Sequence, residues 1–180
     1  MKNKLAGFTI LGVISLLTFS SCSVKDDIGN ADTSTIYQVR LTDAAGPFTK
    51  VNINIQSVLV NYTSDASAGW AVLNTNAGVY DLLTLQNGKD TLLAKGNLNT
   101  GQTVRQIRFV LGSGNTVDVG NLTFPLTIPS GAESGLTVQT NQTLNSSTAS
   151  VLIDFDANAS IKAETDGSYS LRPVLSVRLQ

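Results

Sequence analysis

Histidine is absent from the 180 residues of this chain. Without an imidazole, the protein lacks the side chain that ordinarily exchanges a proton near neutral pH and that most often binds zinc or haem iron. Zinc, haem and Ser-His-Asp chemistry are therefore excluded together. Glutamate is also scarce, since only Glu133 and Glu164 are present, and this scarcity disfavours an enzyme that acts on carbohydrates through paired carboxylates.

Charge of either sign is limited. Twelve Lys and Arg residues stand against 13 Asp and Glu residues, which gives a net charge of −1, and no basic block interrupts the sequence. Proteins that bind nucleic acids need a basic patch to neutralise phosphates. Nucleic acid is therefore not expected as a partner.

The only cysteine of the chain follows a hydrophobic N-terminal segment. Lys2 and Lys4 precede an apolar stretch over residues 5–19, and small residues lead to Cys22. This order is typical of a secretory signal peptide, here residues 1–21. The apolar stretch is shorter than the roughly 20 residues that a membrane-spanning helix requires. We therefore predict export rather than a transmembrane anchor.

The residues around Cys22 resemble the lipobox of bacterial lipoproteins, in which the cysteine becomes the lipid-modified N-terminus. The resemblance implies acylation of Cys22, including palmitate, and attachment to a membrane through the lipid. Ser23 resembles the sorting signal for the outer membrane. Lys25, Asp26 and Asp27 resemble the signal that carries some lipoproteins to the cell surface, which favours the surface over a periplasm-facing orientation. Residues 22–35 are then a flexible tether.

From residue 36 to the C-terminus, apolar residues recur at every second position. This period is typical of strands with one buried face, and no helical period extends over eleven residues. The longest alternating run predicts one strand that carries Tyr169, Leu171, Pro173, Leu175, Val177 and Leu179. We predict a single all-β domain over residues 36–180, an antiparallel β-sandwich that is immunoglobulin-like or prealbumin-like.

Local signals add detail to this prediction. The alternation over residues 51–62 changes parity near Gln56 and Ser57, which indicates a bulge or a crossing between sheets. Asp166-Gly167 predicts a hairpin turn that leads into the last strand. Pro173 lacks a backbone donor and belongs at an edge or a bulge. Residues 80–86 can form a short helical turn.

Several segments resemble, in order, the bacterial lipoprotein family catalogued as domain of unknown function 4382. The similarity covers residues 36–177 and implies a β-sandwich on a lipid anchor, without supplying an activity. The segments that carry it are Val39-Arg40-Leu41-Thr42-Asp43-Ala44, Val51-Asn52-Ile53-Asn54-Ile55, Val79-Tyr80-Asp81-Leu82-Leu83, Gln106-Ile107-Arg108-Phe109-Val110-Leu111-Gly112, Asp154-Phe155-Asp156-Ala157 and Arg172-Pro173-Val174.

Asp154 and Asp156 are two residues apart on a predicted strand, so their carboxylates share one face about 7 Å apart. Three interpretations follow. Together with Asp43 they provide oxygen ligands for Ca²⁺. Alternatively, a pair at this spacing suits an inverting glycosidase. The third and favoured interpretation is that Asp154 and Asp156 form ordinary ion pairs with Arg or Lys on neighbouring strands.

Trp70, the single tryptophan, is a second site hypothesis. A flat ring at the surface can stack on a sugar, whereas a lone tryptophan in a small sandwich usually anchors the core. We therefore predict a non-catalytic binding or structural module, for adhesion or for a surface glycan or protein partner, with a carbohydrate-active enzyme as the alternative. Apart from the calcium hypothesis, no cofactor is expected.

Overall fold

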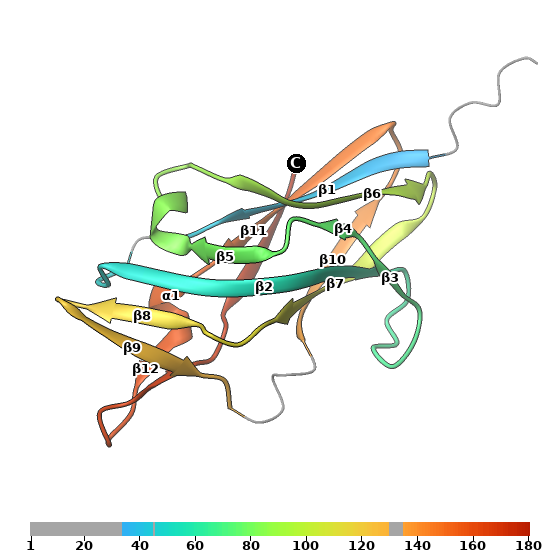
Figure 1. Ribbon diagram of the computed structural model, residues 1–180. Coiled ribbons are helices and arrows are strands. Elements are labelled where there is room, and N and C mark those ends of the chain that lie inside the picture. The colour runs from blue at the N-terminus through green and yellow to red at the C-terminus, as the bar shows by residue number, and fades with distance from the viewer. Residues whose placement is uncertain (1–33, 45, 130–134) are drawn as a thin grey trace, which may run out of the picture. The chain divides into compact units, whose positions relative to one another are not determined.

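The computed structural model describes residues 34–44, 46–129 and 135–180, which form two mixed β-sheets in layers (Figure 1). The five-stranded sheet has the order β14-β11-β1-β6-β4. In that order its strands are Leu175–Leu179, Thr148–Phe155, Ser34–Thr42, Thr91–Asn99 and Asn74–Thr75. The predicted domain start at residue 36 lies two residues inside β1.

The nine-stranded sheet has the order β10-β7-β2-β8-β9-β13-β12, and β3 and β5 also pair with β2. In that order the seven strands are Leu136–Thr143, Thr103–Leu111, Lys50–Asn61, Thr116–Val119, Leu122–Thr127, Tyr169–Leu171 and Ile161–Ala163. The remaining elements are β3 (Trp70–Val72), β5 (Gly78–Asp81), the 3-10 helix η1 (Leu82–Leu85) and the short helix α1 (Ala157–Ser160).

The core lies between the sheets and follows the alternation of the sequence. On β1, Tyr37, Val39 and Leu41 are fully buried, and on β2 the residues Val51 and Ile53 belong to the same hydrophobic cluster. Burying these side chains on one face of each sheet is what drives a sandwich to form. The prediction of an all-β sandwich is confirmed.

Two strand pairs differ from the antiparallel arrangement that we predicted. β1 and β11 are parallel, as are β9 and β13. In both cases the two strands are far apart in sequence, so no hairpin imposes opposite directions on them. β11, for example, follows β10 of the other sheet, and in its own sheet it lies between β14 and β1.

The parity change within β2 is confirmed as a bulge. The pairing of β2 with β7 shifts register between Ile55 and Ser57. As a result, Ile55 and Val58 are both buried although their spacing breaks the alternation. The first half of β2 pairs with β5 and β8, and the second half pairs with β3 and β7. The bulge therefore lets one long strand serve two sets of partners.

The predicted single strand over residues 169–179 is two strands in different sheets. β13 belongs to the nine-stranded sheet and β14 to the five-stranded sheet. The chain crosses between them through Arg172, Pro173 and Val174, where Ser160 fixes its path. The Ser160 carbonyl accepts from the Arg172 amide at 2.7 Å, and its hydroxyl accepts from the Val174 amide at 2.8 Å. Pro173 has no amide to donate, so a crossing between sheets suits it.

The two predicted turns are present. The hairpin between β12 and β13 places Gly167 at a φ of 85°, which favours glycine, and Asp166 Oδ1 accepts from the Ser168 amide at 2.9 Å. The predicted helical turn over residues 80–86 is η1, which is capped by Asp81.

Among the described residues, no helix has the length and apolar character that a bilayer crossing requires.

Candidate functional site

The predicted lipidation and export residues, Cys22, Lys25, Asp26 and Asp27, lie outside the described residues. The other predicted site residues, Asp43, Asp154, Asp156 and Trp70, all lie within them.

Asp43 is a buried carboxylate just beyond the end of β1, with 5% of its surface exposed. Its Oδ1 accepts a hydrogen bond from the Ala157 amide at 2.9 Å, and its Oδ2 accepts from Gln86 Nε2 at 3.0 Å. Burial raises the pKa of Asp43, these two hydrogen bonds oppose the rise, and the nearby charges of Asp154 and Asp156 add to it. The Asp43 side chain thus joins the first residue of α1 to Gln86, which follows η1.

Asp154 and Asp156 do not share a strand face as predicted, because β11 ends at Phe155. Asp156 is instead the N-cap of α1, where its Oδ1 accepts from the Ala159 amide at 2.8 Å. Asp154 forms an ion pair with Arg178 of β14 at 3.0 Å, in line with the favoured interpretation. Its Oδ1 is buried and has no hydrogen-bond partner within the part of the chain that the structure describes.

The three aspartates are not assembled into a metal centre. Asp43 and Asp154 line one pocket of about 250 Å³, but Asp156 does not. Among the described residues, no three His, Cys, Asp or Glu side chains are grouped so that they could hold a metal ion. The physical reason is that each carboxylate accepts from a donor of its own. Asp43 accepts from the Ala157 amide, Asp154 from the Arg178 guanidinium and Asp156 from the Ala159 amide.

Calcium is accordingly expected to leave the melting temperature unchanged. Occupied binding to the native state alone would add about 2.7 kcal/mol at a hundredfold excess over the dissociation constant. The measurement is a thermal melt in EDTA and in millimolar Ca²⁺, with Asp154→Asn as the control. A calcium-dependent rise in the wild type that Asp154→Asn abolishes would contradict this expectation.

Trp70 begins β3 and is half-buried. The guanidinium of Arg108 lies 3.9 Å from the centroid of its ring, and the indole Nε1 donates to the Ala66 carbonyl at 3.0 Å. Arg108 donates to the same carbonyl at 3.0 Å. One face of the ring is thus occupied by a cation–π contact, and the indole helps to hold the loop that contains Ala66. This arrangement is that of a loop anchor.

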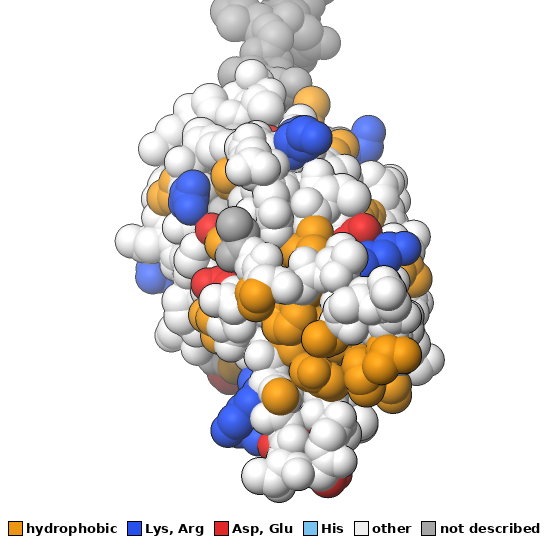
Figure 2. All heavy atoms as spheres, turned by 90° about the vertical axis from the view of Figure 1, so that its left-hand side faces the viewer, with side chains coloured by type: hydrophobic (Ala, Val, Ile, Leu, Met, Phe, Trp, Pro, Cys, Tyr) orange, Lys and Arg blue, Asp and Glu red, His pale blue; other side chains and the backbone are white. Residues whose placement is uncertain are grey.

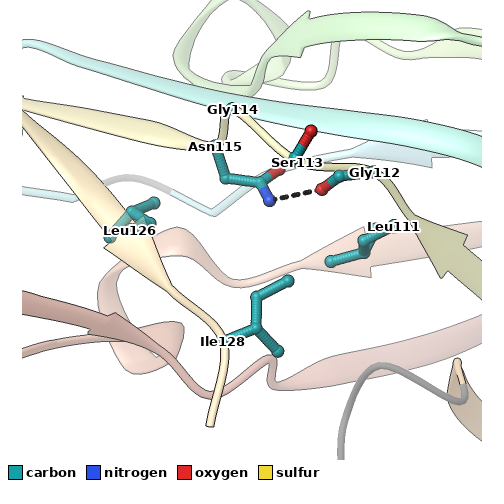
Figure 3. A pocket seen from close by; sticks show the side chains of 7 residues that line it. All are labelled: Leu111, Gly112, Ser113, Gly114, Asn115, Leu126 and Ile128. Atoms are coloured by element: carbon teal, nitrogen blue, oxygen red, sulfur yellow. Dashed lines mark hydrogen bonds between the residues drawn. The ribbon is translucent and has the colours of Figure 1, made fainter. Parts of the chain in front are cut away.

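A pocket of about 380 Å³ lies beside the loop that follows β7 (Figure 3). Its apolar lining comes from Leu111 at the end of β7, Leu126 of β9 and Ile128, whose side chains reach into a common space. The rest of the lining is the loop over residues 112–115. The volume lies at the lower end of the range for small-molecule sites, so it has room for an aliphatic side chain of a partner together with neighbouring groups.

The loop beside this pocket is held rigid by Asn115, which is 3% exposed. Its Nδ2 donates to the Gly112 carbonyl at 2.8 Å (Figure 3), and its Oδ1 accepts from the Asn54 amide of β2 at 2.8 Å. Asn54 Nδ2 in turn donates to the Ser113 carbonyl at 2.8 Å. A Cβ at Gly112 would lie 2.6 Å from Asn54 Nδ2, so any side chain there would displace Asn54 from its bond to Ser113. The wall of the pocket is therefore preformed.

Sequence reasoning missed this pocket. In the sequence, Gly112, Ser113, Gly114 and Asn115 indicate only a turn, and Leu126 and Ile128 follow the ordinary alternation of a strand. The one available signal was the polar asparagine that completes a glycine-rich turn between two apolar strands. Such a side chain often bonds to the backbone nearby.

A second apolar feature lies at the tip of the β8–β9 hairpin. Val119 and Leu122 pair with each other across the turn and are 37% and 64% exposed. Figure 2 faces the end of the molecule where this hairpin lies and shows hydrophobic side chains gathered in one patch. Contiguous apolar surface of this kind marks interaction sites more often than a single exposed residue does.

Comparison with known proteins identifies a family and no activity. The family model described as "Domain of unknown function (DUF4382)" matches residues 34–173. No curated protein matches the chain, and no solved structure does. The match begins at β1 and ends in the crossing before β14, so it covers nearly all of the sandwich and confirms the resemblance to this domain family. The chain belongs to the DUF4382 family of domains of unknown function.

Proposed function

We propose that this chain is a lipid-anchored outer-membrane protein, displayed at the cell surface, whose sandwich binds another protein without catalysis. The observation that carries the binding role is the preformed pocket between Leu111, Leu126 and Ile128. Its wall is rigid before any partner arrives, so binding does not have to order it. The exposed apolar tip at Val119 and Leu122 supports the same role.

The lining favours a protein partner over a glycan. Sugar sites commonly offer a flat aromatic ring, whereas the side chains of this pocket are aliphatic apart from Ser113 and Asn115. Trp70 has one ring face against Arg108 and does not line the pocket. An aliphatic side chain presented by a partner would bury apolar area against Leu126 and Ile128, at roughly 25 cal/mol for each Å².

A non-catalytic role is supported by the use that the fold makes of its carboxylates. Asp43 and Asp156 each accept a backbone amide, and Asp154 pairs with Arg178. These interactions stabilise the fold around α1 and β14. A general acid or base instead needs to meet a substrate within hydrogen-bond reach.

The anchor part of the proposal rests on the sequence around Cys22. We expect Cys22→Ala to abolish incorporation of labelled fatty acid and to leave an unprocessed precursor, because the thiol is the acylated group. In intact cells, added protease should degrade the wild-type domain if residues 25–27 direct it to the surface. Continued acylation of Cys22→Ala would contradict the anchor, and protection of the wild type until lysis would contradict surface display.

The pocket is tested by photo-crosslinking in intact cells. A photoreactive residue at Ser113, which is exposed at the rim, should yield one protein adduct, because a bound partner would lie within reach. Ile128→Trp places a bulky ring in the space and should reduce the adduct about tenfold, as expected for a loss of roughly 1.4 kcal/mol in binding. Ile128→Val, which keeps the pocket open, is the matched control.

Two results would contradict the pocket proposal. One is an equal yield from a photoreactive residue at Val72, which is 70% exposed on β3 and does not line the pocket. The other is an adduct that contains sugar and no peptide, since this would show that the pocket binds a glycan and not a protein.

A further inference from the structure

The edge strands of the two sheets differ in how well they are protected. Native proteins usually shield a sheet edge by keeping it short or by interrupting it with a bulge, a proline or charges. β4 and β12 have only two and three residues, and the pairing of β10 with β7 is interrupted by a register shift. β14 is a regular five-residue strand at the end of its sheet, with one charged residue.

The backbone of β14 leaves one row of hydrogen-bonding groups free of strand partners. The Val174 carbonyl accepts from the Asp156 amide, and the Gln180 amide donates to the Ser150 carbonyl. Residues of even number therefore bond to β11, and by alternation the amides and carbonyls of Leu175, Val177 and Leu179 point to the opposite side. Within the described residues, β14 pairs with no strand except β11.

The sequence of β14, Leu-Ser-Val-Arg-Leu, has the symmetry that pairing with a copy of itself requires. In an antiparallel pair centred on Val177, Leu175 faces Leu179 of the second copy and Val177 faces Val177. Ser176 faces Arg178, so no like charges stand directly opposite, and each Arg178 is paired with Asp154 of its own chain. Such a pair is isologous, the commonest form of dimer symmetry.

We propose that two copies of this chain associate through antiparallel pairing of β14 with β14, which joins two five-stranded sheets into one. The pairing satisfies the outward amides and carbonyls of Leu175, Val177 and Leu179 on both copies. It also continues the apolar face, because Leu175 and Val177 already pack against the core and Leu179 is 54% exposed. The second copy is favoured over an unrelated strand because the side chains match in this one register.

The register is tested by disulfide trapping in the full-length chain. Ser176→Cys and Arg178→Cys lie on exposed positions of β14. When both variants are expressed together, a mixed disulfide dimer should form under mild oxidation. Residues 176 and 178 oppose each other in the dimer as a non-hydrogen-bonded pair, and the Cα atoms of such a pair are about 4.5 Å apart. Each variant alone places its cysteines diagonally, beyond the roughly 7 Å limit for a disulfide, so its dimer yield should be about tenfold lower.

Val79→Cys, 61% exposed on β5, measures background trapping, including any disulfide through Cys22. Adding Leu179→Lys to both trapping variants should lower the mixed dimer about tenfold, because it places a cation opposite Leu175. Circular dichroism verifies that these chains remain folded. Equal yields from the mixture, the single variants and Val79→Cys overturn the proposal, and so does trapping of Ser176→Cys mainly on a different protein.

Discussion

Replacing Asn115 by alanine is expected to lower the free energy of unfolding by about 2 kcal/mol, because it removes two partly buried hydrogen bonds of a buried side chain at once. The Asn54 amide loses its acceptor, and the Gly112 carbonyl loses its donor. Both groups belong to the wall of the pocket or to the strand behind it, so the loop should also lose its fixed shape. The protein adduct formed through Ser113 should therefore fall together with stability.

The measurement for Asn115→Ala is chemical denaturation of the full-length protein, combined with the crosslinking assay. Asn97→Ala is the matched control, since Asn97 is exposed on β6 and surface substitutions usually change stability by less than about 0.5 kcal/mol. Equal stability of the two variants would show that Asn115 does not hold the loop.

The second large effect is expected at Asp43. Asp43→Ala should destabilise the fold by about 2 kcal/mol, because the buried Ala157 amide is left without an acceptor. Asp43→Asn keeps an oxygen for that amide, and the amide group of Gln86 can turn to accept from the new Nδ2. The asparagine variant should therefore be more stable than the alanine variant at neutral pH.

Asp43 also predicts a pH dependence of defined sign. Burial raises the pKa of Asp43 in the folded state above its ordinary value of 3.8. At a pH between 3.8 and the raised pKa, the folded state therefore binds more protons than the unfolded state. Stability contributed by the protonated group is therefore present below 3.8 and is lost as pH rises through the raised pKa.

The pH profile of Asp43→Asn isolates this contribution. The stability of the wild type minus that of the variant should fall as pH increases over this window and then level off. Exposed carboxylates such as Asp166, whose pKa is lowered by hydrogen bonds from Ser168, contribute the opposite slope equally to both proteins. A difference that is flat, or that rises with pH, would contradict a raised pKa for Asp43.

The sequence alone determines the local features of this domain. Alternation of apolar residues predicts strands because a side chain on a strand faces one side or the other. For the same reason the parity change in β2 predicts its bulge, which pairing with β7 confirms. The turn at Asp166-Gly167 follows from the backbone freedom of glycine, which is also a property of the residue itself.

Only the tertiary structure decides which strands become partners. Residues 169–179 alternate apart from Val174, yet β13 and β14 belong to different sheets, because burial on one face leaves the hydrogen-bonding edges unassigned. The aspartate cluster fails as a metal site for a similar reason. Asp156 caps the start of α1, and the spacing between Asp154 and Asp156 in the sequence does not reveal that a helix begins there. The pocket requires Leu111 and Leu126 to converge from two strands that do not pair. Such convergence depends on contacts between distant segments, and those contacts form only when the whole core is buried together.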